Sequence, residues 1–281
     1  STATQMFNQA YAPPIAKYQR DTQTICNLGV ISPVTGAHID TSKTVFVDDL
    51  ASAAIVKDNS QLEQVANTLN DRLDEAFSDH NLQQNRTKGV TLAHVLGNGA
   101  RYYTIHLDQS SLSTARQARY LGPQIHCKGD TMCEADNRAS AAWAAFFAYS
   151  NLWKSKASRR FKVKMFFSVV VSTLISGLSC FVLTKAAFRH LCTAYYKMLR
   201  KIAGSACTQK VILANGKVKY TTLSNDNVCQ YLGVASLGTL LRVQRLNFLR
   251  NMISRPILHE VYLTCLLGKY DVDARTISNK W

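Results

Sequence analysis

Hydrophobic and polar residues follow two different periods along this chain of 281 residues. In the first 128 residues, short apolar runs bounded by turn residues predict strands at 27–32, 42–47, 50–56, 90–95, 102–107 and 120–126. Helical spacing predicts one helix over residues 2–20, interrupted at Pro13 and Pro14, and a second that Ser60 caps and that buries Leu62 to Phe77. This mixture predicts an α+β fold for residues 1–128.

From residue 130 onward the apolar spacing is helical. Residues 135–153 predict an Ala-rich helix, with Trp143, Phe146, Phe147 and Trp153 in the core rather than stacked on bases. Thr184 is placed to cap a helix over 185–202 that ends at Gly204. Asn-Gly at 215–216 predicts a hairpin turn, and residues 237–252 predict a basic amphipathic helix. The chain thus divides into 1–128, 129–205 and 206–281.

Residues 165–184 carry no charge, and twenty residues are enough to cross a bilayer. Against a membrane span, the segment holds six Ser or Thr residues and Gly177 near its middle. The preferred interpretation is a buried pair of helices bent at Gly177, and association with a membrane is the alternative.

Basic residues are concentrated in one block of the chain, which has a formal net charge of +15. Residues 1–136 hold 11 basic and 14 acidic side chains, whereas residues 137–225 hold 15 basic and none that is acidic. Such a block repels itself unless a polyanion lies against it. Nucleic acid is the first candidate, an anionic membrane surface the second, and a solvated face without a partner the third.

Cysteine spacing and composition exclude several classes of protein. The eight cysteines form no C-x-x-C pair, so we predict reduced thiols rather than zinc ligands. The hydrophobic fraction of 47% excludes a disordered or low-complexity chain. No secretory signal is visible and the first residue is Ser, so we expect an intracellular protein, in the nucleus or an organelle, that is part of something longer.

The sharpest chemical signal is Phe-Val-Asp-Asp at residues 46–49, at the tip of a predicted hairpin. Asp48 and Asp49 repel each other at close range, so each favours a cation. Carboxylates of this kind hold Mg²⁺, and two Mg²⁺ ions can stabilise the attacking and leaving oxygens of a phosphoryl transfer. The alternative is an ordinary Asp-Asp turn on the surface.

The order of motifs resembles the reverse transcriptases of non-LTR (LINE-like) retrotransposons, over nearly the whole chain. Residues 46–49 resemble that family's aromatic-x-Asp-Asp box, and residues 1–8, Ser-Thr-Ala-Thr-Gln-Met-Phe-Asn, resemble the end of its Gln-Gly-Asp motif. Residues 82–88, Leu-Gln-Gln-Asn-Arg-Thr-Lys, resemble the family's Leu-x-x-Asn-x-x-Lys element. Residues 120–125, Tyr-Leu-Gly-Pro-Gln-Ile, resemble its Tyr-Leu-Gly-x-x-Ile strand. Basic helices and an Arg-Leu-rich tail at 242–255 follow.

The resemblance implies part of a palm with an antiparallel sheet, followed by a mainly helical thumb and a small tail of hairpin and helix. Asp48 and Asp49 would bind paired Mg²⁺, and Lys88 would approach the phosphates of the incoming nucleotide. Residues 129–204 would grip an RNA or an RNA–DNA primer–template duplex. The predicted contacts are Arg138, Lys154, Lys156, Arg159, Arg160, Lys162, Lys164, Lys197, Arg200 and Lys201.

Several departures from the family pattern limit this expectation. Its fingers and third catalytic carboxylate lie upstream of the Gln-Gly-Asp motif, before Ser1. Val47 replaces a common Ala, and Gly89-Val90 replaces Thr-Glu. We therefore expect a fragment that binds primer–template nucleic acid but does not polymerise alone, with the missing palm and fingers or other protein subunits as partners. The alternative is a retroelement-derived RNA-binding or structural subunit of a larger complex, without enzymatic activity.

Overall fold

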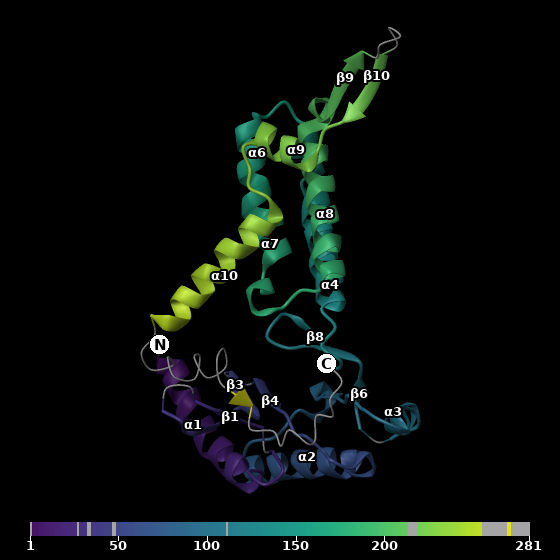
Figure 1. The fold of residues 1–281 in the computed structure, drawn as a ribbon. Coiled ribbons are helices and arrows are strands. Elements are labelled where there is room, and N and C mark those ends of the chain that lie inside the picture. Colours follow the sequence, from purple (N-terminus) through teal and green to yellow (C-terminus); the bar gives the residue numbers. More distant parts are fainter. Residues whose placement is uncertain are drawn as a thin grey trace. The chain divides into compact units, whose positions relative to one another are not determined.

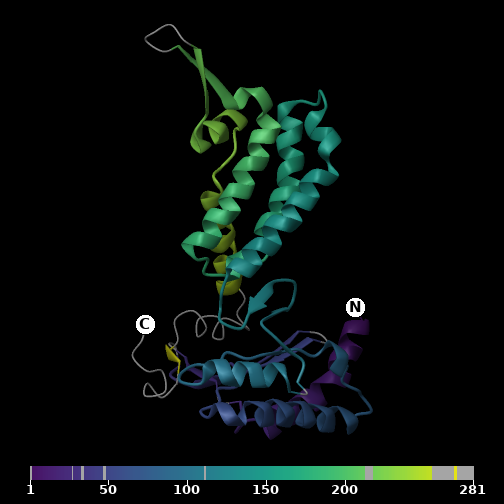
Figure 2. The same ribbon diagram turned by 90° about the vertical axis from the view of Figure 1, so that its right-hand side faces the viewer.

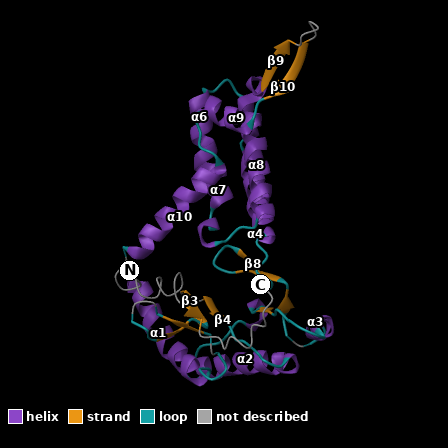
Figure 3. Cartoon of the chain, in the orientation of Figure 1, coloured by secondary structure: helices purple, strands orange, loops and turns teal. Residues whose placement is uncertain are grey.

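A computed structural model describes residues 2–26, 28–32, 35–46, 49–110, 112–212, 218–254 and 269–270 (Figure 1). The chain divides into two compact units. Unit 1 comprises Ser1–Leu121 and Asn251–Trp281, and unit 2 comprises Gly122–Arg250. Helices are combined with short, mainly antiparallel strands, which confirms the α+β class (Figure 3).

Unit 1 combines three helices with several short strands among its described residues. The helices are α1 (Thr2–Asp21), α2 (Leu62–Ser78) and α3 (Ala100–Asp108), with 3₁₀ turns η1 (Asn59–Gln61) and η2 (Arg86–Lys88). The strands are β1 (Gly29–Ile31), β2 (His38–Asp40), β3 (Lys43–Phe46), β4 (Asp49–Ser52), β5 (Thr91–Leu92), β6 (Thr114–Ala115), β7 (Gln117–Arg119) and β11 (Lys269–Tyr270). Strands β11, β1 and β2 form an antiparallel sheet, β3 pairs antiparallel with β4, and β5 pairs parallel with β6.

Helix α1 is continuous through Pro13 and Pro14, so the predicted interruption is wrong. Ile15 and Tyr18 follow the prolines and are buried in a cluster with Leu73, Ala76 and Phe77, most of it on α2. Packing against α2 therefore holds the second half of α1 in helical conformation, although each proline lacks the N–H of a helical hydrogen bond.

The predicted strand at 102–107 is also wrong, because these residues lie in α3. Tyr103 and Leu107 are four residues apart, which places both on the inner side of the helix, and Leu107 is buried. The hydroxyl of Thr104 donates to the carbonyl of Ala100 at 2.7 Å, a bond that only a helical turn allows. The apolar run was too short to distinguish a strand from a helix.

Other predicted elements of the first 128 residues exist but are shorter. The predicted strands at 50–56 and 90–95 shrink to β4 and β5, and the one at 120–126 to β8 (Gln124–His126). Positive φ angles at Leu121 (51°) and Gly122 (105°) turn the chain before β8. Helix α2 is confirmed, but Ser60 is not its cap: the side chain of Asp58 accepts from the Ser60 amide at 2.9 Å.

Unit 2 is mainly helical (Figures 1 and 2). Its elements after β8 are α4 (Met132–Ala148), α5 (Ser150–Lys154), α6 (Arg159–Met165), a π-helical segment η3 (Phe166–Val171), α7 (Ser172–Ile175), 3₁₀ turns η4 (Leu178–Cys180) and η5 (Gly204–Cys207), α8 (Lys185–Ala203), β9 (Thr208–Ile212), β10 (Val218–Thr222), α9 (Asn225–Leu232) and α10 (Leu237–Ile253). Helices α4 and α8 lie side by side, and the β9–β10 hairpin projects beyond the end of α8 (Figure 1).

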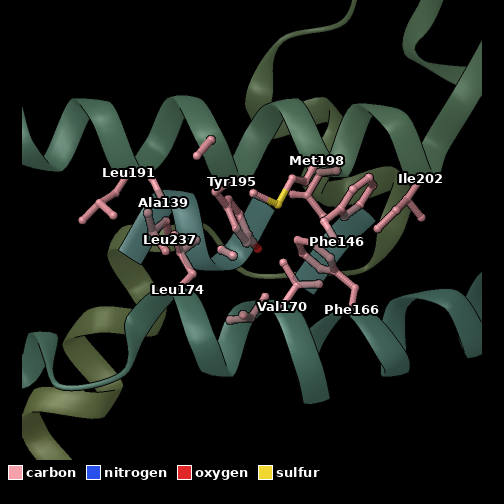
Figure 4. Close-up of a cluster of buried hydrophobic side chains, with 14 of the residues drawn as sticks. Ala139, Phe146, Phe166, Val170, Leu174, Leu191, Tyr195, Met198, Ile202 and Leu237 are labelled. Carbon is pink, nitrogen blue, oxygen red and sulfur yellow. The ribbon is translucent and has the colours of Figure 1, made fainter. Parts of the chain in front are cut away.

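The core of unit 2 lies between α4, α8 and the segment from α6 to α7 (Figure 4). It contains 23 buried residues, and the aromatic side chains of Phe146, Phe166 and Tyr195 pack at its centre. The Tyr195 hydroxyl donates to the carbonyl of Ala235 at 2.8 Å, so this buried polar atom is satisfied. Phe146 and Trp153 are core residues as predicted and Trp143 packs at the edge of the core, whereas Phe147 is 57% exposed.

The uncharged segment 165–184 is largely inside unit 2. Phe166, Val170, Leu174 and Leu178 are completely buried, and the helix breaks at Gly177, where φ is +73°. The bend is as predicted, but only the single 3₁₀ turn η4 follows it in place of a second helix. Across the described ranges, no helix has both the length and the apolar character needed to cross a membrane.

The predicted ends of α8 and the predicted hairpin are confirmed. The Thr184 hydroxyl accepts from the amide of Ala187 at 3.2 Å, which caps α8, and the helix ends at Gly204. Ile212 pairs with Val218 across β9 and β10. The Asn-Gly turn at 215–216 lies outside the described residues.

Candidate nucleic-acid interface

The Phe-Val-Asp-Asp box lies on the β3–β4 hairpin. Phe46 pairs with Asp49, so the two connecting residues are Val47 and Asp48. The predicted Asp48-Asp49 turn is therefore wrong by one residue, because backbone pairing of the strands includes Asp49. Val47 and Asp48 lie outside the described residues, whereas Asp49 is exposed at the start of β4.

Asp49 is close to one residue of another predicted motif. Burial, and after it the negative charge of Asp49, raise the pKa of Tyr120, whose hydroxyl donates to the Thr44 carbonyl at 3.3 Å. The fold thus brings the start of residues 120–125 beside the hairpin. Lys88 is exposed at the end of η2, and no described contact joins its side chain to Asp49.

The described residues do not build the paired Mg²⁺ site that the resemblance implies. None of their His, Cys, Asp and Glu side chains form a group of three or more that could hold a metal ion. Asp49 is the one carboxylate of the predicted pair that the structure describes. Asp48 lies outside the described residues, so the paired Mg²⁺ site stays a prediction and we derive no catalytic step from this hairpin.

The two units differ in net charge. Unit 2 holds 19 Lys and Arg residues against 4 Asp and Glu, whereas unit 1 holds 14 of each. The entire net charge of +15 is therefore carried by residues 122–250. A surface of this sign attracts polyanions at long range.

The pairing of cations also differs between the units. Among the described residues of unit 1, basic side chains form ion pairs at several places: Lys17–Asp79, Arg20–Asp21, Lys43–Asp40, Arg72–Glu75 and Arg86 with Asp71 and Asp74. Among the described side chains of unit 2, Arg138 is the one Lys or Arg within ion-pair distance of a carboxylate, that of Glu134. The other described Lys and Arg side chains of this unit therefore keep a charge that no carboxylate of the unit neutralises.

Residues 154–164 provide the densest group of these cations, which we call the 154–164 cluster. Lys154, Lys156, Arg160 and Lys164 are exposed. The ammonium of Lys162 instead donates to two backbone carbonyls, of Trp153 at 2.8 Å and Ser155 at 2.7 Å, and so closes the end of α5.

Arg159 of the same cluster is partly engaged. Its guanidinium lies 4.7 Å from the centre of the Tyr231 ring, a cation–π contact that ties α6 to α9. Arg159 and Lys162 therefore have structural contacts, while Lys154, Lys156, Arg160 and Lys164 have none that fixes them.

The side chain of Arg138 is held by contacts within the fold and is mostly buried. Its guanidinium donates to Glu134, which is fully buried, and to the Gly122 carbonyl at 3.4 Å. Glu134 also accepts from the Gln124 amide at 2.7 Å and from Asn137 at 3.2 Å. Sequence reasoning missed Glu134, although the Glu-to-Arg spacing of four residues on a helix was a visible signal.

The three predicted contacts on α8 differ in exposure. Lys197 and Lys201 are exposed, whereas Arg200 is half-buried and donates to the Asn225 side chain at 2.8 Å. Arg189, on the same helix and exposed, was missed by the sequence reasoning. Its spacing of eight residues from Lys197 places both on one face of α8.

Comparisons with known proteins give one informative similarity. The chain is 26% identical over 166 residues to an uncharacterized protein of Caenorhabditis elegans whose name describes it as transposon-derived. The match covers 59% of this chain and 57% of that relative, so the chain spans little more than half of the relative's length. No family model and no solved structure matches the chain. The similarity indicates a transposon-related origin.

Proposed function

We propose that the chain derives from the reverse transcriptase of a non-LTR retrotransposon and that unit 2 binds the backbone of RNA or an RNA–DNA hybrid. The observation that carries the binding proposal is the unpaired positive charge of unit 2. Nineteen basic residues stand against four acidic ones, and only Arg138 of the described cations has a carboxylate partner.

The kind of contact follows from the side chains involved. Lys and Arg neutralise phosphates and release counterions, which supplies affinity without base recognition. The 154–164 cluster presents five exposed cations within eleven residues, and four of them have no contact that fixes them. Such a surface fits an A-form duplex, which proteins recognise through its shape and phosphates.

The lineage part of the proposal rests on two independent supports. The motifs at 1–8, 46–49, 82–88 and 120–125 follow the order of the reverse-transcriptase family. The transposon-derived relative in C. elegans supports a mobile-element origin. The proposal concerns binding and includes no catalytic step, and Asp48, Asp49 and Lys88 stay predictions.

The test is the salt dependence of binding to a fluorescein-labelled RNA–DNA hybrid, followed by fluorescence anisotropy. The variant Lys156→Gln/Arg160→Gln/Lys164→Gln removes three exposed cations of the 154–164 cluster. Each lost phosphate contact lowers the slope of log K against log salt by about 0.9, so the expected loss is about 2 to 3 in slope.

The matched control removes three exposed cations of unit 1, as Lys57→Gln/Arg101→Gln/Arg116→Gln. It changes the net charge of the chain by the same amount, and we expect its slope to stay near that of the unmodified chain. Equal slopes for both triple variants would show that binding follows total charge alone and would contradict an interface on unit 2.

A further inference from the structure

A pocket of about 300 Å³ lies on one side of unit 2, at the contact of α8 and α9. Six of its lining residues come from α8 and one, Asn225, from the first turn of α9. The α8 residues are Arg189, Cys192, Thr193, Tyr196, Lys197 and Arg200. Their spacing of three and four residues makes them one continuous face of the helix.

The polar groups in this pocket are predominantly cationic. Arg189, Lys197 and Arg200 extend over about 16 Å of the helix axis, at about 1.5 Å per residue. One carboxylate, that of Asp226, lies close enough to affect the pocket residue Tyr196. The pKa of Tyr196 is raised mainly by burial, then by Cys229 and Cys192, and then by the charge of Asp226. Three cations against one carboxylate leave the pocket positive.

Arg200 supplies the observation that points to a ligand. Its Nη2 atom donates to Asn225 at 2.8 Å, while its Nη1 atom is buried and has no hydrogen-bond partner among the described residues. A buried guanidinium N–H without an acceptor is costly, and native structures rarely leave one unsatisfied. Arg200 lines the pocket, so an oxygen acceptor that binds there and reaches this nitrogen would satisfy it.

We propose that this α8–α9 pocket binds a phosphate group, with Arg200 donating to it and Lys197 and Arg189 neutralising its charge. The planar fork of a guanidinium matches phosphate oxygens, and an ammonium adds a point charge. Cys192 and Tyr196 provide a less polar wall for the organic part of a phosphate ester. The phosphate is either a diester of a nucleic-acid backbone, which rests on the proposed function, or the group of a free phosphate ester.

The first arm of the test uses inorganic phosphate as the probe. Arginine side-chain NMR signals of the full chain are followed as phosphate replaces chloride at constant ionic strength. We expect the Arg200 signal to shift in a saturable way, and Lys197→Gln to weaken that response. Lys201→Gln removes an adjacent exposed cation outside the pocket and is the matched control.

The second arm measures affinity for the RNA–DNA hybrid with Lys197→Gln, Arg200→Gln and Lys201→Gln. A charged hydrogen bond to phosphate lost in Arg200→Gln should weaken binding by about tenfold if the backbone occupies the pocket. Arg200→Lys retains the charge but loses the fork, so its loss should be smaller. Because Arg200 contacts Asn225, exposed Lys197 provides the variant least able to disturb folding.

Together, the two arms distinguish a backbone phosphate from a free phosphate ester. They also distinguish failure of the pocket proposal from failure of the proposed nucleic-acid binding. A phosphate response with no selective loss of hybrid affinity indicates a free phosphate ester, and stands even if unit 2 binds no nucleic acid. Selective loss with Lys197→Gln and Arg200→Gln indicates a backbone phosphate. If phosphate does not shift Arg200 and all three variants bind the hybrid alike, the pocket is not a phosphate site.

Discussion

The two units of this chain use charged and apolar side chains in different ways. Unit 1 has equal numbers of acidic and basic residues, several ion pairs and a buried cluster of five residues. Unit 2 buries a cluster of 23 residues and leaves nearly all described cations without a carboxylate. A larger core buries more apolar surface, which can offset repulsion among cations, and the exposed cations of unit 2 are available to an external anion.

The largest expected effect comes from the core of unit 2. Phe166→Ala should lower the free energy of unfolding by about 4 kcal/mol, because the ring is completely buried and leaves a cavity. Phe161→Ala, at a position 48% exposed on the neighbouring α6, should change it by less than about 0.5 kcal/mol. Urea unfolding of both variants tests this. Similar costs would mean that burial in the core of unit 2 does not decide what the loss of a ring costs.

The second effect concerns the buried carboxylate of unit 2. Glu134→Ala should destabilise the protein by about 3 kcal/mol, because Arg138 would keep a mostly buried charge without its partner. The exposed Asp136, which faces His190 at 3.1 Å, provides the control, and Asp136→Ala should cost less than about 1 kcal/mol. Thermal unfolding at pH 7 compares them. If Glu134→Ala destabilised the protein as little as Asp136→Ala, Arg138 would not depend on Glu134 and would belong with the cations available to nucleic acid.

Alkaline pH should act on unit 2 through Tyr196. Burial, with smaller contributions from nearby thiols and Asp226, raises the pKa of this phenol from 10.0 to about 12. Because the folded state holds the proton more tightly, its stabilisation is complete below pH 10 and is lost as pH rises towards 12. Tyr196→Phe should flatten the fall in melting temperature across that range. Tyr220→Phe, at an exposed site on β10, should leave it unchanged.

The smallest effect is expected for the surface ion pairs of unit 1. Arg86 pairs with Asp71 and Asp74; Arg86 and Asp71 are exposed, and Asp74 is partly exposed. Arg86→Gln should therefore lower the melting temperature only slightly, and the difference should vanish in about 0.5 M salt as screening increases. A large difference that persists at high salt would show that unit 1 depends on its ion pairs more than on its small core.

Several elements could be predicted because their signals are local. The Thr184 cap, the end of α8 at Gly204 and the break at Gly177 depend on one side chain and a few backbone atoms. The sequence-based predictions were wrong where packing against residues far away in the chain decided the backbone conformation. Helix α1 passes through two prolines because α2 holds Ile15 and Tyr18, and residues 102–107 fold as a helix around Leu107.

The candidate interface shows the same division. Charge counts along the chain were sufficient to locate the basic block, but they treated all its members alike. Only the folded environment separates Arg138, held by Glu134, and Lys162, held by two carbonyls, from the exposed Lys156 and Arg160. The pocket around Arg200 was also beyond the sequence, because Asn225 comes to it from another helix.

The sequence by itself determined the α+β class, the cationic character of residues 137–225 and the hydrophobic periods of α2, α4 and α8, since each follows from residue types at short spacing. The tertiary structure decided which cations have partners and which carboxylate is buried. It also decided the conformation of the prolines in α1 and the burial of Arg200 Nη1. These properties depend on atoms far apart in the chain, and only packing brings such atoms within hydrogen-bond distance.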